Sequence, residues 1–139
     1  MSHPAPPDGY QLHDRHSPLT RPWEPIFARH TDRSVELALE IREPHCNSRG
    51  LAHGGLISAL SDNAMGLSAI KAAHADGLGA MRALTVSLTM DYVDSARPGD
   101  FLEIVPVVVR AGRTLAFVEC RSVVGDRVVA RGSATFRMA

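Results

Sequence analysis

Residues 54–77 read GGLISALSDNAMGLSAIKAAHADG, and this run constrains the fold more than any other part of the chain. It has the length and spacing of one long helix, which glycines at positions 77 and 79 would end. An apolar stripe follows the helical repeat, made of Leu56, Ile57, Leu60, Ala64, Leu67 and Ile70. A neighbouring stripe holds small or polar residues, namely Ser58, Asp62, Gly66 and Ala69. Because the helix is apolar nearly all round, other elements must wrap it.

Alternating apolar residues on both sides of this helix predict the strands that would wrap it. The alternation predicts a half-buried strand within residues 34–43 and another within residues 84–92. Three further apolar segments, 101–110, 114–124 and 127–137, are separated by glycine-containing turns, and Pro106 marks an edge or a bulge. One strand before the helix and four after it, with hairpin-length links, indicate an α+β fold: a curled antiparallel sheet wrapped around a central helix. An open sheet edge or an uncovered helix face would favour a dimer.

Composition and charge restrict the class of protein. The 139 residues divide into a loosely ordered leader with a short helical turn at residues 1–32 and a single domain at residues 33–139. Fifteen basic side chains balance fifteen acidic ones, which argues against a nucleic acid or a membrane surface as partner. Two cysteines, no signal peptide and a helix interrupted by charged residues indicate a soluble, cytoplasmic protein. The histidines show no metal-ligand spacing, and no cofactor-binding motif is present.

The predicted fold does not explain Asp62, because this residue lies in the middle of a helix that should be buried. An unpaired buried carboxylate costs several kcal/mol, roughly, through lost solvation. Either Asp62 faces solvent on an exposed side of the helix, or it is held for a chemical purpose. The neighbouring Ser58, Ser61 and Asn63 are compatible with the first alternative.

Several motifs resemble one known family. Asn47, the triplet His53-Gly54-Gly55 and Asp62 stand at that family's spacing, and residues 85–100 and 111–136 resemble its central strand and its closing hairpin. The family is that of the hotdog-fold acyl-CoA thioesterases, in the branch with the phenylacetic-acid-pathway enzymes and thioesterase superfamily member 2. The resemblance extends over residues 33–137. It implies a hotdog fold and hydrolysis of an acyl-CoA thioester, without a metal or redox cofactor.

The resemblance also implies roles for individual residues. Asp62 would be the general base or the nucleophile, two roles that the sequence does not separate. The Gly54 N–H would polarise the thioester carbonyl at the start of the helix, and Gly55 would ease entry into the helix. Asn47 would orient water or thioester, and Thr85 would hold the water. His53 belongs to the motif, although a loop histidine bonded to backbone is the plainer reading of it.

Substrate contacts follow from the same resemblance. Gly66, one turn after Asp62, would leave room for the acyl group. Arg97, Arg113 and Arg131 lie on or beside predicted turns, where they could pair with the phosphates of CoA. Cys46 has no histidine partner placed by the sequence, so an inert thiol is expected there.

Spacing along the helix bears on the number of chains in each site. The eight residues from Gly54 to Asp62 span about 12 Å along a helix axis. If the helix begins at Gly54, these two residues of one chain are too far apart to contact the same substrate atom. Either the helix begins later, or the site lies between two chains. The resemblance favours the second account, with Asn47 and Gly54 from one subunit and Asp62 and Thr85 from the other. We expect a homodimer or homotetramer whose active sites lie at the dimer interface.

Two rivals to hydrolysis use the same fold. A hotdog domain that binds acyl-CoA without turnover, as a sensor, would leave Asp62 incidental. A hydratase would need a different arrangement of His and Asp, which this chain lacks. The sequence does not identify the acyl group of the substrate, because the length of the pocket that would hold it depends on side-chain packing.

Overall fold

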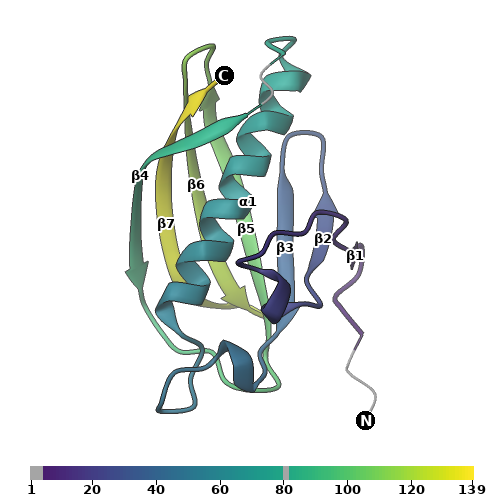
Figure 1. Ribbon diagram of the computed structural model, residues 1–139, viewed down its shortest axis with the longest axis vertical. Coiled ribbons are helices and arrows are strands. Elements are labelled where there is room, and N and C mark those ends of the chain that lie inside the picture. Colours follow the sequence, from purple (N-terminus) through teal and green to yellow (C-terminus); the bar gives the residue numbers. More distant parts are fainter. Residues whose placement is uncertain (1–4, 80–81) are drawn as a thin grey trace.

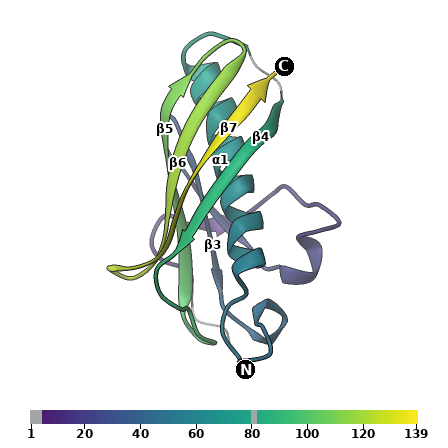
Figure 2. The same cartoon turned by 90° about the vertical axis from the view of Figure 1, so that its left-hand side faces the viewer.

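A single long helix lies along one face of a seven-stranded antiparallel sheet (Figures 1 and 2). The computed structural model describes residues 5–79 and 82–139, so residues 1–4 of the expected leader lie outside it. The strands are β1 (Gln11–Leu12), β2 (Phe27–His30), β3 (Val35–Glu40), β4 (Ala83–Tyr92), β5 (Phe101–Ala111), β6 (Leu115–Val124) and β7 (Arg127–Met138). Two short 3-10 helices, η1 (Arg21–Trp23) and η2 (Glu43–His45), lie before the long helix α1 (Gly54–Ala75). The predicted α+β architecture is confirmed.

Helix α1 has the bounds that its sequence predicts. It begins directly after His53 and runs for 22 residues to Ala75, and Gly77 follows at a φ of +73° that suits glycine. Leu60 and Ala64 of its apolar stripe are fully inaccessible to solvent, and Leu56 and Ile57 are buried beside them. Leu67 and Ile70, which the sequence placed in the same stripe, are only half-buried. Within residues 5–79 and 82–139, no helix combines the length and apolarity that crossing a bilayer demands.

The order of the strands differs from a run of consecutive hairpins. The sheet runs β1-β2-β3-β5-β6-β7-β4, so β4 pairs with β7 and lies at one edge, far from its sequence neighbour β5. The predicted hairpin-length link from β4 to β5 is therefore a crossover around residues 93–100 at the end of the sheet. Hydrophobic alternation reports which face of a strand is buried but not which strand is its neighbour. The crossover leaves the outer side of β4 open.

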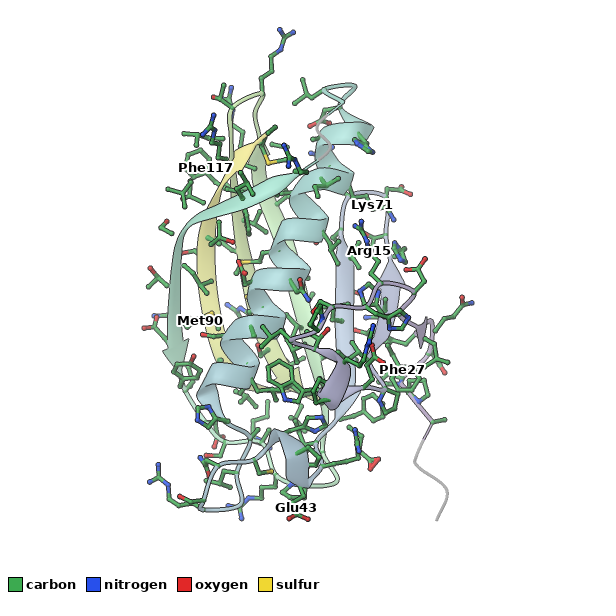
Figure 3. All side chains as sticks on the ribbon, viewed as in Figure 1. Arg15, Phe27, Glu43, Lys71, Met90 and Phe117 are labelled. Carbon is green, nitrogen blue, oxygen red and sulfur yellow. The ribbon has the colours of Figure 1, made fainter. Side chains whose placement is uncertain are left out.

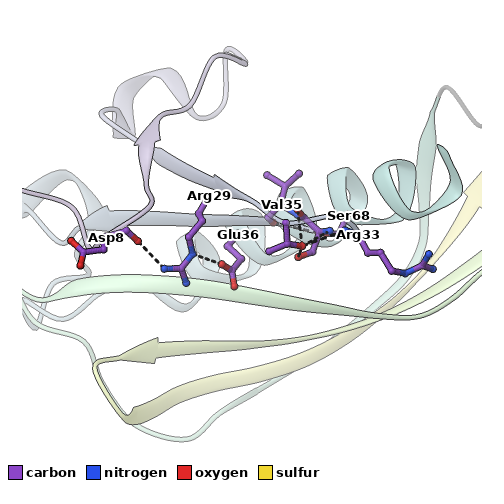
Figure 4. Close-up of polar contacts among 8 residues, drawn as sticks. Asp8, Arg29, Arg33, Val35, Glu36 and Ser68 are labelled. Atoms are coloured by element: carbon purple, nitrogen blue, oxygen red, sulfur yellow. Dashed lines mark hydrogen bonds and ion pairs between the residues drawn. The ribbon is translucent and has the colours of Figure 1, made fainter. Parts of the chain in front are cut away.

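The segment before β3 is more ordered than the sequence predicts. It contains one turn of 3-10 helix, η1, and also β1 and β2, which extend the sheet beyond β3. Arg29 on β2 donates to Glu36 at 2.6 Å and to the Asp8 carbonyl at 2.9 Å (Figure 4). Its guanidinium lies 4.5 Å from the centre of the Tyr10 ring. Strands this short carry too little periodicity to be recognised without the tertiary contacts that hold them.

This segment also changes the burial of β3. The strand was expected to be half-buried, yet Glu36 and Ala38 on its second face are only 7% and 1% exposed. The Arg29 side chain satisfies the Glu36 carboxylate, which removes the penalty of burying it unpaired. On the side of α1, the Ser68 hydroxyl accepts the Val35 N–H at 2.9 Å (Figure 4). The same hydroxyl donates to the Ala64 carbonyl at 2.7 Å. Strand β3 is thus covered on both faces.

Candidate active site between helix α1 and strand β4

Helix α1 begins with a histidine cap. The Nδ1 atom of His53 accepts the Gly55 N–H at 2.8 Å, and the His53 carbonyl accepts the Ile57 N–H at 3.2 Å. A side-chain acceptor at this position satisfies one of the N–H groups that a helix leaves unpaired at its start. The Gly54 N–H has no hydrogen-bond acceptor among the described residues, so it is available to a ligand. His53 therefore has the structural role that the plainer sequence reading assigned to it, and any further role stays a prediction.

The two glycines after His53 lie close to neighbouring side chains. A Cβ on Gly54 would lie 3.3 Å from two atoms of the Tyr92 ring. A Cβ on Gly55 would lie 3.0 Å from Nδ1 and 3.1 Å from Cε1 of the His53 ring. The bare Cα atoms thus make room for two side chains of this chain, which is a reason for glycine that the sequence did not show.

Asp62 and Thr85 form the central pair of the candidate site. Thr85 on β4 donates from Oγ1 to Oδ1 of Asp62 on α1 at 2.6 Å. Asp62 is half-buried and Thr85 is exposed, so the carboxylate is neither sealed in the core nor free in solvent. A carboxylate that is held by one donor and open on another side can still accept a proton or attack a carbon atom.

A bulge in β4 places Thr85 opposite Asp62. Strict alternation would put Thr85 on the face opposite to Leu88 and Tyr92, as the sequence pattern predicted. The register with β7 instead shifts between Thr85 and Ser87, which adds Val86 as an extra residue. Thr85, Leu88 and Tyr92 then all face α1. This correction to the predicted pattern is what assembles the Asp62–Thr85 pair.

Tyr92 and Ser58 belong to the same face and were missed as functional candidates. The Tyr92 hydroxyl donates to the Gly54 carbonyl at 2.9 Å and lies 2.7 Å from the Ser58 hydroxyl. Gly54, Ser58 and Asp62 are spaced by four residues, so they form one line along the helix facing β4. The small and polar stripe seen in the sequence was the signal for this face, but nothing in the sequence paired it with β4.

Asn47 lies in the loop between η2 and α1. Its side-chain oxygen accepts the Arg49 and Leu51 N–H groups at 2.9 and 3.2 Å, which makes it a turn-forming residue. The loop lines a hollow of about 520 Å³ together with Glu43, Cys46 and Pro98. Glu43 marks this end of the molecule in Figure 3. The oxygen is thus occupied, whereas the amide NH₂ has no acceptor among the described residues.

A second hollow lies at the start of α1 on the side of the N-terminal segment. It has a volume of about 360 Å³ and is lined by Trp23, Pro44, His45, Cys46, His53, Gly55 and Leu56. His45 is buried, accepts the Arg42 N–H on Nδ1 at 2.9 Å, and donates from Nε2 to the Trp23 carbonyl at 2.9 Å. Burial lowers the pKa of His45, so the ring is held in its neutral form. Burial also raises the pKa of the Cys46 thiol, in keeping with the inert thiol that we expect.

The remaining predicted substrate contacts do not converge within one chain. Arg97 lies beside the Asn47 hollow, because the next residue in the chain, Pro98, lines that hollow. Arg113 lies in the β5–β6 turn, about 35 Å away along the eleven residues of β5. Phe117, near that turn, appears in Figure 3 at the end of the molecule opposite Glu43.

Arg131 and Gly66 are placed by their neighbours on the sheet. Arg131 lies on the sheet face away from α1, where its Nε is 3.2 Å from Asp91 Oδ2. A Cβ on Gly66 would lie 3.4 Å from the Phe136 ring, so this glycine faces the sheet. Among the described residues, no three His, Cys, Asp or Glu side chains form a group suited to a metal ion.

A comparison with protein families now gives this geometry a context. Residues 49–131, which include His53, Asp62 and Thr85, match the family model described as the thioesterase superfamily. The chain belongs to the thioesterase superfamily. This membership confirms the family that the sequence motifs resemble.

Three known proteins resemble most of this chain. A protein of Pseudomonas aeruginosa named "Putative esterase PA0474" is 39% identical over 133 residues, which cover 95% of this chain and 96% of that protein. Human acyl-coenzyme A thioesterase 13 is 28% identical over 99 residues, covering 70% of this chain and 67% of that protein. The structure of smu.793 from Streptococcus mutans, bound to acetyl CoA, superposes with a TM-score of 0.76 at 25% identity and covers 92% of this chain and 95% of that one. The hotdog architecture expected from the motifs is thereby confirmed.

Proposed function

We propose that this protein hydrolyses an acyl-CoA or aryl-CoA thioester to the free acid and CoA. The observation that carries the proposal is the Asp62 carboxylate, held by Thr85 on the open face between α1 and β4. An unoccupied N–H at Gly54, at the positive end of a 22-residue helix, supplies the second element that thioester hydrolysis needs. The likeness to an acyl-coenzyme A thioesterase and to a structure with bound acetyl CoA supports the substrate class.

Each group has a defined task in the proposed reaction. The Gly54 N–H binds the carbonyl oxygen and stabilises the negative charge that develops there. As a general base, Asp62 takes a proton from water while the water oxygen bonds to the carbonyl carbon. The C–S bond then breaks, and the proton returns from Asp62 to the CoA thiolate. As a nucleophile, Asp62 would attack the carbonyl carbon, and the C–S bond would break to release the CoA thiolate and leave a mixed anhydride. Water would then hydrolyse this anhydride to the free acid and the Asp62 carboxylate, and the proton released would go to the thiolate. In either route, the Thr85 hydroxyl fixes the orientation of the carboxylate.

The distance along α1 supports a site built from two chains. The helix does begin at Gly54, so the alternative of a later start is wrong, and Gly54 and Asp62 are about 12 Å apart along the axis. Strand β4 ends the sheet, and its outer side is open along ten residues. Leu84, Val86 and Tyr92 on this strand are 49, 62 and 50% exposed. A second copy that pairs here would cover this edge and bring its own α1 toward the site. We therefore propose a homodimer, alone or paired into a tetramer.

Mixing two inactive variants tests this shared site. Asn47→Asp keeps the oxygen that the loop uses and removes the amide donor, whereas Asp62→Asn removes the carboxylate. If the two residues come from different chains, a heterodimer contains one intact site, and a statistical mixture regains about a quarter of wild-type turnover. If both residues act from the same chain, the mixture stays as inactive as its parents.

The proposed arginine contacts can be assigned by separate substitutions. Arg97 lies closest to the Asn47 hollow and is the first candidate for a CoA phosphate, while Arg113 would reach a site only from another chain. Arg131 would first have to break its ion pair with Asp91 before it could bind a phosphate. Each alanine variant should raise KM for acyl-CoA without lowering kcat if the arginine binds a phosphate. Gly66 as a space for the acyl group stays a prediction as well.

The decisive experiment measures CoA release with a thiol reagent on acetyl-, hexanoyl-, lauroyl-, phenylacetyl- and benzoyl-CoA. Wild-type protein should hydrolyse at least one of them, and Asp62→Asn, which keeps the shape of the side chain, should lose nearly all activity. An unimpaired Asp62→Asn would leave the activity but refute this mechanism. Binding of acyl-CoA without any hydrolysis would assign the chain as a binding domain instead.

A further inference from the structure

The peptide unit that joins Gly54 to Gly55 is held at both of its polar ends. Its carbonyl oxygen accepts a hydrogen bond from the Tyr92 hydroxyl at 2.9 Å. Its N–H donates to Nδ1 of His53 at 2.8 Å. Because a peptide unit is planar, these two contacts fix the direction of the whole unit at the start of α1.

A third side chain extends this arrangement. The Ser58 hydroxyl lies 2.7 Å from the Tyr92 hydroxyl. Since the Tyr92 proton points to the Gly54 carbonyl, Ser58 is the donor in this second hydrogen bond. Two consecutive hydrogen bonds therefore run from Ser58 through Tyr92 to Gly54. They link the start of the helix to the last residue of β4.

Tyr92 also restrains Gly54 by packing. Two atoms of its ring occupy the space 3.3 Å from where a Cβ of Gly54 would stand. The Gly54 N–H belongs to the preceding peptide unit, His53–Gly54, whose carbonyl accepts the Ile57 N–H. The held Gly54–Gly55 unit restrains that N–H through the φ and ψ angles of Gly54, which a glycine without such contacts would vary widely. A donor that stabilises an oxyanion must instead point to one position before the reaction begins.

We propose that Tyr92 is a positioning residue for thioester hydrolysis, which aims the Gly54 N–H by holding the Gly54 carbonyl. This inference rests on the proposed function, in which that N–H polarises the substrate carbonyl. Tyr92 does not touch the reacting atoms in this role. Its hydroxyl sets the conformation of Gly54, and the Ser58 hydroxyl orients that of Tyr92.

Tyr92→Phe tests the proposal because it keeps the ring and removes only the hydroxyl. We expect kcat to fall roughly tenfold with KM within about twofold, a smaller loss than the roughly 100-fold that removal of an oxyanion donor costs. Ser58→Ala should give a smaller loss of the same kind. Tyr10→Phe is the matched control, since the Tyr10 hydroxyl is buried without a hydrogen-bond partner in the described residues and lies in the N-terminal segment. A wild-type kcat in Tyr92→Phe, or an equal loss in Tyr10→Phe, would overturn the proposal.

Amide NMR separates this inference from the proposed function. In Tyr92→Phe, the amide signals of Gly54 and Gly55 should shift, and the Gly55 amide, which donates to His53, should exchange with solvent faster, while the amides of the β6–β7 turn stay unchanged. Unchanged glycine amides would show that Tyr92 does not hold this peptide, whatever the enzyme does. Shifted amides in a protein that hydrolyses no thioester would refute the proposed function and the catalytic role of Tyr92 together.

Discussion

The hydroxyl of Thr85 donates to Oδ1 of Asp62 at 2.6 Å, and the two residues meet because β4 carries a bulge directly after Thr85. Without the extra residue, Thr85 would lie on the other face of the sheet. The pair joins helix α1 to β4, the edge strand that follows α1 in the sequence. It is the contact on which the proposed chemistry depends.

Two substitutions at Thr85 should distinguish the contribution of its hydroxyl to kcat from the contribution of its side-chain shape. Thr85→Val has the same shape and no donor, so we expect kcat to fall roughly tenfold because the Asp62 carboxylate loses a charge-assisted hydrogen bond. Thr85→Ser keeps the donor and should stay within about threefold of wild type. The measurement is kcat at saturating acyl-CoA. Full activity in Thr85→Val would reduce Thr85 to an ordinary strand residue.

Two glycines in the same helix should respond oppositely to alanine. Gly54→Ala places a Cβ 3.3 Å from the hydrogen-bonded Tyr92 ring, so we expect a loss of about 1 kcal/mol in unfolding free energy through overpacking. Gly66→Ala places its Cβ 3.4 Å from Phe136, an ordinary contact, and should gain about 0.5–1 kcal/mol from helix propensity. Denaturant unfolding of both variants checks the signs, and a loss in Gly66→Ala would show that Phe136 cannot adjust.

The buried His45 should make stability depend on pH. Burial lowers its pKa from the ordinary 6.5, so the unfolded chain binds a proton that the folded chain refuses. Its stabilising contribution is complete above about pH 7.5 and is lost as the pH falls below about 6.5. Burial also lowers the pKa of His13, which acts with the same sign.

A variant at position 45 isolates this effect. His45→Asn retains an acceptor for the Arg42 N–H but cannot titrate, so its stability should be lower at neutral pH and decline less steeply between about pH 7 and pH 5. The unfolding free energy measured by denaturant at several pH values tests this. Identical slopes for wild type and variant would remove His45 as a source of the pH dependence.

The ion pair between Arg29 and Glu36 should stabilise the N-terminal segment. Arg29→Met leaves the Glu36 carboxylate, whose side chain is 10% exposed, without its cation, and we expect a loss of about 3 kcal/mol in unfolding free energy. The double variant Arg29→Met/Glu36→Leu should recover most of that loss, because no buried charge remains. Thermal unfolding measures both, at about 2–4 °C per kcal/mol for a chain of this size. An equal loss in the double variant would assign the effect to the other contacts of Arg29.

Local sequence determined the elements and the chemical candidates. The helix from Gly54 to Ala75 and the strands β5, β6 and β7 follow from periodicity and from turn residues, because both signals come from neighbours along the chain. The family motifs identified Asp62 and Thr85 as candidate residues, but they did not predict the hydrogen bond between them.

Tertiary structure decided which of these elements and candidates meet. Strand order placed β4 beside β7, the bulge after Thr85 turned that side chain toward Asp62, and Tyr92 reached Gly54 across 38 positions of sequence. The N-terminal strands β1 and β2 extend the sheet beyond β3, where Arg29 pairs with the buried Glu36. Periodicity along a strand specifies a face but neither its register nor its neighbour, since these depend on packing between segments distant in sequence. For that reason the sequence alone predicted the parts of the site, and the folded chain was needed to show how they are held.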